Sequence, residues 1–334
     1  MMDRKTFLAV SAATAAAAVT SSAFAQQGKT PNKNDGPLIK RIRIATINTP
    51  DRDATLDWYA KWFDYYTHEN SFVEQALAYS WGAPGMTGKP YSLISSQGSP
   101  DVFIRIVQGD KTAPFNPRTT YGWGSLEFIV DDLDAQFKKM KAGGVDIFRE
   151  PASLGGIFAS IHAMQLMGPM SITHNLTVEK GDRAKSNLPV AKSQVDRMFL
   201  VGANGPDLNA LRDFYVNTFN MSKGPDYDYP IPVLADAMKL PKDHLFKLTL
   251  VRSAEKGNTL ELHDLPKPGG PRPTIMGQLP PGVGMVSFGV KDINAIAGHF
   301  INPPEVQKSV AYSGKPSVTL KGAAGELIEL IEEA

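Results

Sequence analysis

The chain repeats itself, and this repeat restricts the fold more than any other feature of the sequence. Landmarks of its first part return 156 residues later: Pro50-Asp51, Tyr59 and Phe63 return as Pro206-Asp207, Tyr215 and Phe219. A second stretch, residues 124–133, returns as residues 284–293 at an offset of 160. Two such offsets predict four units in a row, in which unit three repeats unit one and unit four repeats unit two.

Each unit has the pattern of one strand, one helix and about three further strands. Residues 41–48 alternate apolar and polar side chains, as a half-buried strand does, and residues 53–65 place apolar side chains on one helical face. Residues 125–130 predict the first strand of unit two, which leads into a helix over residues 133–142 that ends at Gly143. The sequence therefore predicts an α+β protein of four βαβββ units.

Composition limits the classes of function. A chain of 334 residues is long enough for two domains, and a hydrophobic fraction of 42% is ordinary for a protein that buries a core. The formal net charge is +1 and the sequence has no basic stripe, so we expect no nucleic-acid partner. The absence of cysteine excludes disulfides, thiolate metal ligands and cysteine nucleophiles.

Residues 1–25 have the parts of an export signal. A positive start at Arg4-Lys5 precedes an apolar, alanine-rich run, and Ala23-Phe24-Ala25 is a small-x-small cleavage site. We expect a periplasmic mature protein that begins at Gln26 and is exported by the general secretory or the twin-arginine route. Residues 26–37 are polar and predict a flexible linker. No later apolar run is long enough to span a bilayer, so we expect no membrane contact in the mature form.

The duplication also suggests domain boundaries. We expect a first module over residues 38–182, a charged and polar linker over residues 183–193, and a second module over residues 194–334. Each module would then contain two consecutive units and form one cup.

The order of signals along each unit resembles the vicinal oxygen chelate superfamily, which includes glyoxalases, bleomycin-resistance proteins and extradiol dioxygenases. The segments that carry the resemblance are residues 207–219, 284–293 and 322–330. The resemblance covers nearly all of residues 40–333 and implies two glyoxalase/dioxygenase-like modules with cupped mixed β-sheets. It implies little about the reaction, because one fold hosts many chemistries.

In that superfamily, paired units hold a divalent metal with ligands from their first and last strands. The resemblance places a carboxylate ligand on Glu329, four residues after Gly325. It places Met285 and Ser125 where histidine ligands are expected, and Asn175 where a second glutamate is expected. A thioether suits Fe(II), Mn(II) or Mg(II) poorly. The cofactor is therefore left open: a divalent metal is one alternative, but the usual histidine ligands are absent.

Glu261 and His263 are further candidates for chemistry, because they share one face of a predicted strand. Together with Glu329 they would give two carboxylates and one imidazole in one cup. That set predicts either a divalent-metal site or a metal-free acid/base site. The alternative is structural, with Glu261 paired to Arg197 and His263 capping a loop.

Three residues are candidates for substrate binding. Arg197 would hold an anionic group of the ligand. Tyr227 and Tyr229 lie in a long insertion, residues 225–242, and insertions of this length often cover a binding site.

The candidate residues support three functions. The first is an isomerase or lyase for a small aromatic or carbonyl compound, in which Glu329 or Glu261 takes a proton beside a carbonyl and His263 returns it. The second is a non-catalytic protein that binds a small ligand, and the third is a metal-dependent, extradiol-like dioxygenase with an atypical site. In all three the partner is a small molecule, and a homodimer remains open.

Overall fold

The computed structural model describes residues 36–296 and 300–333. The expected export signal over residues 1–25 lies outside these residues, as does the expected linker up to residue 35. Within the described part, no helix combines the length and the apolar character that a bilayer crossing requires.

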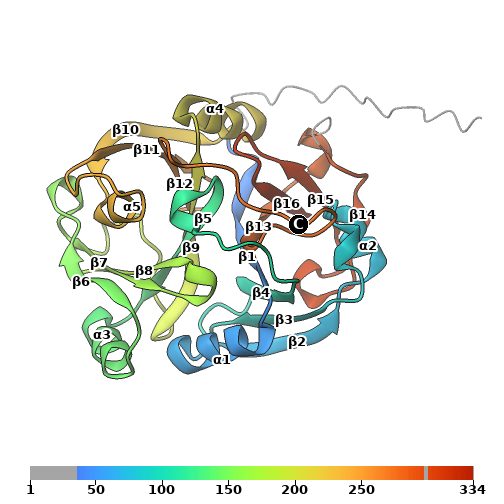
Figure 1. Ribbon diagram of the computed structural model, residues 1–334, viewed down its shortest axis with the longest axis horizontal. Coiled ribbons are helices and arrows are strands. Elements are labelled where there is room, and N and C mark those ends of the chain that lie inside the picture. Colours follow the sequence, from blue (N-terminus) through green and yellow to red (C-terminus); the bar gives the residue numbers. More distant parts are fainter. Residues whose placement is uncertain (1–35, 297–299, 334) are drawn as a thin grey trace, which may run out of the picture.

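Two mixed sheets, each curled into a cup, form the body of the molecule (Figure 1). Sheet one of the described chain has eight strands in the order β14 (Glu305–Val306), β15 (Pro316–Lys321), β16 (Leu327–Glu332), β13 (Gly282–Val290), β1 (Ile39–Thr49), β4 (Phe103–Gln108), β3 (Pro90–Ser95) and β2 (Tyr66–Phe72). Sheet two likewise has eight, in the order β10 (Ser222–Pro230), β11 (Leu245–Arg252), β12 (Thr259–Asp264), β9 (Val195–Gly205), β5 (Gly122–Val130), β8 (Thr173–Glu179), β7 (Ile161–Met167) and β6 (Ile147–Ser153). The expected α+β fold of paired βαβββ units in two cupped sheets is confirmed.

The units pair across the chain rather than along it. In sheet one, β1 of unit one runs antiparallel to β13 of unit four, and in sheet two β5 of unit two runs antiparallel to β9 of unit three. This corrects the expected division of the cups between residues 38–182 and residues 194–334, because neither range contains a complete cup. Sequence neighbours are the more usual partners, and a repeat offset does not encode which two units share a sheet. Residues 183–193 accordingly connect two strands of the same sheet, β8 and β9.

The main helices begin where the sequence supplies a capping carboxylate. The side chains of Asp51, Asp132 and Asp207 accept hydrogen bonds from first-turn amides of the helices that follow them. These helices are α1 (Arg52–Phe63), α3 (Leu133–Ala142) and α4 (Leu208–Phe219), and they confirm the helical stretches expected from the sequence. Two shorter helices are α2 (Gln75–Ser80) and α5 (Pro232–Ala237).

Consecutive units lie in different sheets, but their helices join them. From α1 of unit one, the Tyr59 hydroxyl lies 2.7 Å from Nε2 of His174 in unit two. From α4 of unit three, Tyr215 donates a hydrogen bond to Oε1 of Glu326 in unit four at 2.8 Å. Burial lowers the pKa of His174 to about 4 and raises the pKa of Glu326 to about 7. Both tyrosines belong to one apolar core, which contains residues of both sheets.

The two cups differ in what fills them. The cup of sheet one is packed by its own chain, with Trp81, Met86 and Tyr312 buried against apolar side chains of its strands. The cup of sheet two contains a cavity. A ligand of appreciable size therefore fits in the cup of sheet two.

Candidate functional site

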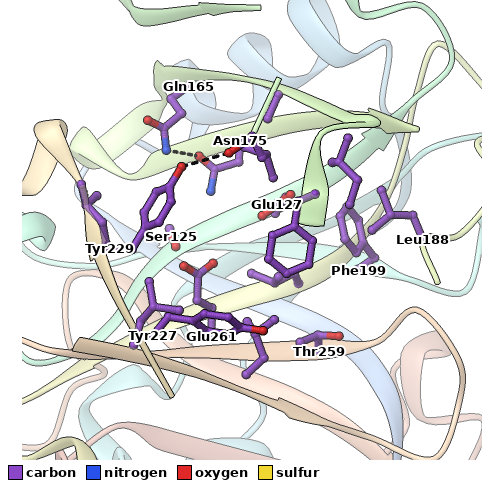
Figure 2. Close-up of a pocket in the computed structure, with 18 of the residues that line it drawn as sticks. Ser125, Glu127, Gln165, Asn175, Leu188, Phe199, Tyr227, Tyr229, Thr259 and Glu261 are labelled. Carbon is purple, nitrogen blue, oxygen red and sulfur yellow. Dashed lines mark hydrogen bonds between the residues drawn. The ribbon is translucent and has the colours of Figure 1, made fainter. Parts of the chain in front are cut away.

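A cavity of about 550 Å³ occupies the cup of sheet two (Figure 2). Its floor comes from strands β12, β9, β5 and β8, and its walls come from β7, β10, β11 and the connections around residues 154–160, 185–188 and 253–258. This volume lies within the range of sites that bind small molecules. We call this space the sheet-two cavity.

The floor of the cavity is polar because of strand alternation. Successive side chains of a strand point to opposite faces, so β12 presents Glu261 and His263 to the cavity and β5 presents Ser125 and Glu127. The strand register places Glu261 and Ser125 on either side of Gly202 in β9. A Cβ atom at Gly202 would lie 2.2 Å from Ser125 Oγ, so a glycine here leaves the room that the hydroxyl needs.

Glu261 and His263 form a close pair on β12, with His263 Nε2 lying 3.2 Å from Glu261 Oε1. Burial alone would raise the pKa of Glu261, but the adjacent His263 outweighs it and brings that pKa below its ordinary value. Nδ1 of His263 is buried and has no hydrogen-bond partner among the described residues. The pair keeps Glu261 ionised at neutral pH, and the alternative pairing of Glu261 with Arg197 does not occur.

Glu127 is the second carboxyl group of the cavity floor. The Thr177 hydroxyl donates a hydrogen bond to its Oε1 at 2.6 Å. Burial, and next the negative charge of Glu261, raise the pKa of Glu127 to about 7, although hydrogen bonds from Thr177 and Asn175 oppose this rise. A carboxyl group with such a pKa can both give and accept a proton near neutral pH.

Asn175 lies opposite Glu127 on the neighbouring strand β8. Its Oδ1 accepts a hydrogen bond of 3.0 Å from Nε2 of Gln165, which lies on β7 (Figure 2). Because this contact occupies the oxygen of Asn175, the amide nitrogen is the group available to Glu127. The polar floor therefore continues from β12 to β7.

The two expected tyrosines, Tyr227 and Tyr229, line the cavity from β10 (Figure 2). The ring centre of Tyr227 lies 6.2 Å from that of Phe158, and the Tyr229 hydroxyl donates to the carbonyl oxygen of Leu154 at 3.2 Å. Phe158 and Leu154 belong to the connection between β6 and β7. These contacts join β10, one edge strand of sheet two, to the connection that follows β6, the other edge strand. They narrow the open side of the cup.

Glu329 lies in the other cup, which corrects the expectation that it shares a site with Glu261 and His263. Its strand β16 pairs with β13 in sheet one, whereas β12 belongs to sheet two. Glu329 is fully buried and accepts hydrogen bonds from Trp81 Nε1 at 3.0 Å, from the Tyr312 hydroxyl at 2.7 Å and from the Ser287 hydroxyl.

Arg105 completes the surroundings of Glu329. This arginine occupies the strand position in unit one that Glu261 has in unit three, and its Nη1 lies 3.6 Å from Glu329 Oε2. Both side chains are fully buried. A guanidinium group therefore lies beside the carboxylate to which the family resemblance assigned a metal, and Glu329 serves the packing of its cup.

Arg197 does not line the sheet-two cavity, which corrects its expected role in substrate binding. Its Nη1 lies 3.2 Å from Glu255 Oε1, and this ion pair occupies the guanidinium group. Glu255 does line the cavity. Arg197 therefore balances the charge of Glu255 at the cavity edge. Other cations, among them Arg118 and Arg149, line the cavity itself.

Glu127 is the functional candidate that the sequence reasoning missed. Ser125 was identified by its match to the first strand of unit four, and Glu127 follows it by two residues. The same alternation that joined Glu261 to His263 would have placed Glu127 beside Ser125. Strand alternation therefore predicts Glu127, whereas the family resemblance concerns only Ser125 on this strand.

The donors in the two cups do not fit a divalent metal. Across residues 36–296 and 300–333, no three His, Asp or Glu side chains come together in a way that could bind one ion. The expected set of Glu261, His263 and Glu329 is divided between two sheets. In addition, Glu261 is engaged by His263, and Glu329 by Arg105 and three hydrogen-bond donors.

Comparison with solved structures identifies the fold. Glyoxalase I from Zea mays aligns with a TM-score of 0.58 and 16% identity over 87% of this chain and 92% of the maize chain. A putative dioxygenase from Bacillus subtilis subsp. subtilis str. 168 aligns with a TM-score of 0.60 and 12% identity over 89% and 86% of the two chains. No protein-family model and no curated protein matches the sequence. Both solved structures are vicinal oxygen chelate proteins, and this chain has the fold of that superfamily.

Proposed function

We propose that the chain binds a small organic carbonyl compound in the sheet-two cavity and transfers a proton beside the carbonyl, as an isomerase or lyase does. The observation that carries this proposal is a pair of acids, Glu127 and Glu261, whose surroundings move their pKa values in opposite directions. Such a divergence within one site separates a general acid from a general base.

The two acids take different parts in the reaction. Glu261, kept ionised by His263, takes the proton from the carbon beside the carbonyl, and the electrons of the C–H bond form a C=C bond. Glu127 gives its proton to the carbonyl oxygen, so that an enol forms in place of a charged enolate. When a second C=C bond lies beside that carbon, Glu261 returns its proton to the far carbon of this bond while Glu127 takes back the enol proton. The C=O bond re-forms, the C=C bond has moved by one carbon, and the isomerisation is complete. In an elimination, a leaving group departs from the carbon beside the new double bond and takes the proton that Glu261 holds, while the enol proton returns to Glu127 and the C=O bond re-forms.

This assignment revises the roles expected from the sequence. Glu329 has no part in the reaction because it lies in the cup of sheet one. His263 holds the base in its ionised form instead of returning the proton. Tyr227 and Tyr229 bound the ligand space, and we propose that they contact the apolar body of the substrate.

Binding without catalysis is the second candidate function. It is favoured by the aromatic and aliphatic walls of the cavity, to which Phe199, Leu188 and Tyr227 contribute (Figure 2). A protein that only sequesters its ligand needs these walls but has no use for two acids with divergent pKa values.

Hydrogen exchange in D₂O separates the two functions. Aryl ketones, hydroxy ketones and 2-oxo acids are incubated with the protein, and NMR follows the loss of the hydrogens beside each carbonyl. We expect protein-dependent exchange that falls by about 100-fold or more in Glu127→Gln and in Glu261→Gln. Glu74→Gln is the matched control, because Glu74 is an exposed acid outside the cavity that pairs with Lys308. Ligand binding without any exchange would refute proton transfer and leave the binding function.

We also propose that the protein acts in the periplasm, on the basis of the signal in residues 1–25. In cells that express the full chain, mass spectrometry of the periplasmic fraction should find a mature form that begins at Gln26. Recovery of the intact chain from the cytoplasm alone would contradict this proposal.

A further inference from the structure

Two arginines that line the sheet-two cavity have no acidic partner within ion-pair distance among the described residues. Arg118, just before β5, and Arg149, on β6, both line the cavity and are half-buried. Nε of Arg118 donates to Asn116 Oδ1 at 3.2 Å, and Nη2 of Arg149 donates to the Ser153 carbonyl oxygen at 3.3 Å. Within the described chain, neither guanidinium group has a carboxylate oxygen within 4.0 Å. Asp146 and Asp236 act on the Arg118 charge from beyond this distance, and the hydrogen-bond acceptors of both guanidinium groups are neutral.

Other arginines of the protein show that this arrangement is selective. Those that pair with a carboxylate are Arg41, Arg43, Arg52, Arg105, Arg197 and Arg212, and none of these lines the cavity. Two arginines outside the cavity, Arg183 and Arg272, are exceptions: they have no ion pair in the described residues and donate to backbone carbonyl groups. The third arginine of the cavity, Arg252, is exposed at its edge and also lacks an ion pair in the described part of the chain.

The acids of the cavity do not use this positive charge. Glu261 contacts His263, Glu255 pairs with Arg197, and Glu179 accepts a hydrogen bond from the Gly181 amide. Glu127 accepts a hydrogen bond from Thr177, and burial raises its pKa to about 7, so it is only partly ionised at neutral pH. Within the described chain, none of these four acids lies within 4.0 Å of the Arg118 or Arg149 guanidinium group. Both groups are therefore half-buried without an ion pair, which is unfavourable.

The strand register relates Arg149 to the proposed chemistry. Arg149 lies opposite Gln165, Gln165 opposite Asn175, and Asn175 opposite Glu127, so one row crosses β6, β7, β8 and β5. Three strand spacings of about 4.8 Å each separate the two ends of the row along the sheet, and the curvature of the cup shortens the direct path. A ligand whose anionic group contacts Arg149 therefore needs a chain of several bonds between this group and the atom that contacts Glu127.

From this arrangement we infer that the ligand is an organic carboxylate with an apolar body, whose carboxylate group contacts Arg149 and Arg118 while its other end lies over Glu127 and Glu261. The inference deepens the proposed function by naming its substrate class. A guanidinium group donates two parallel hydrogen bonds to a carboxylate, so the ligand would satisfy both the charge and the donors of these side chains.

Binding of ω-phenylalkanoates tests the inference without requiring any reaction. Phenylacetate, 3-phenylpropanoate and 4-phenylbutanoate are compared by calorimetry at pH 7.5 with their primary amides, which have the same shape and no charge. We expect at least one acid to bind about tenfold or more tightly than its amide. The preference should fall to about twofold or less in Arg118→Gln/Arg149→Gln, and it should persist in Arg52→Gln, which removes one guanidinium charge outside the cavity.

Several outcomes would overturn the inference: equal affinity of acids and amides for the wild-type protein, no binding by any of the three acids, or an undiminished preference in the double variant. The wild-type comparison stands even if the double variant fails to fold. A preference for acids in a protein that catalyses no hydrogen exchange would refute proton transfer and leave the carboxylate site in place. Hydrogen exchange without a preference for acids would refute the carboxylate site and leave proton transfer in place.

Discussion

Glu127 and Glu261 show how surroundings differentiate two identical carboxyl groups. They lie on strands separated only by β9, and both are enclosed by sheet two. An imidazole 3.2 Å away keeps Glu261 ionised, whereas Glu127 has hydroxyl and amide neighbours and the negative charge of Glu261. The proposed division into acid and base follows from this difference of neighbours.

The raised pKa of Glu127 predicts how the hydrogen-exchange rate depends on pH. Glu127 acts as an acid only when it is protonated, so the rate should fall as the pH rises through about 7. At low pH the rate should fall again when Glu261 becomes protonated, below the ordinary range of a glutamate. In Glu127→Gln the residual rate should lose the decline near pH 7. An unchanged decline in this variant would show that another group is the acid.

Glu326 predicts a pH dependence of stability. Its pKa is about 7 in the folded protein, above that of an ordinary glutamate. Its contribution to stability is therefore fully present below the ordinary pKa and is lost as the pH rises through about 7. Between pH 5 and pH 8 we expect the free energy of unfolding to fall by on the order of 3 kcal/mol from this residue. Denaturant titrations of wild type and Glu326→Gln should show a smaller fall in the variant, and equal falls would contradict the assignment.

The sequence predicted part of the site. Glu261 and His263 share a strand face and line the cavity, as do Tyr227 and Tyr229. The two tyrosines were expected in a long insertion, but they lie on the edge strand β10, which pairs with β11. The role of Glu329 was not predictable from its own strand, because its partners Trp81, Arg105 and Tyr312 come from distant segments. Side-chain contacts between distant segments have no local signature in the sequence.

At the level of elements, local signals were sufficient for helices and insufficient for strand pairing. Apolar side chains at helical spacing predicted α1, the return of its landmarks 156 residues later predicted α4, and the stretch that ends at Gly143 predicted α3. The alternating strands were predicted from period two, but the pairing of β1 with β13 and of β5 with β9 was not. Strand pairing depends on which edges meet after the chain has folded, and four similar first strands offer several combinations.

The cap of α1 predicts a cost for removing one side chain. Oδ1 of Asp51 accepts a hydrogen bond of 3.0 Å from the Ala54 amide. Asp51→Ala should lower the free energy of unfolding by about 1 kcal/mol, because a helix-terminal donor loses its acceptor. Asp57→Ala, at an exposed position inside the same helix, is the control and should change stability by less than about 0.5 kcal/mol. Equal effects of the two changes, measured by urea titration, would argue against a capping role.

For the whole molecule, the exchange of units makes the two halves of the chain interdependent. Each sheet takes its central antiparallel pair from both halves, and the joints at Tyr59–His174 and Tyr215–Glu326 connect the two sheets. One cup has become packed and the other keeps a cavity. We infer that packing against sheet one, whose cup is filled, stabilises sheet two, whose cup contains the cavity.

This interdependence predicts the behaviour of fragments. Residues 36–182 contain β1 and β5 without their antiparallel partners, so this fragment alone should expose two long apolar strand edges and aggregate. Co-expressed with residues 183–334, it should be recovered as a soluble complex, because both sheets can then form. Size-exclusion chromatography and near-ultraviolet circular dichroism would follow the recovery. A soluble fragment 36–182 with native-like tertiary signals would mean that units one and two can form a cup of their own, so that the pairing across the chain would not be required for folding.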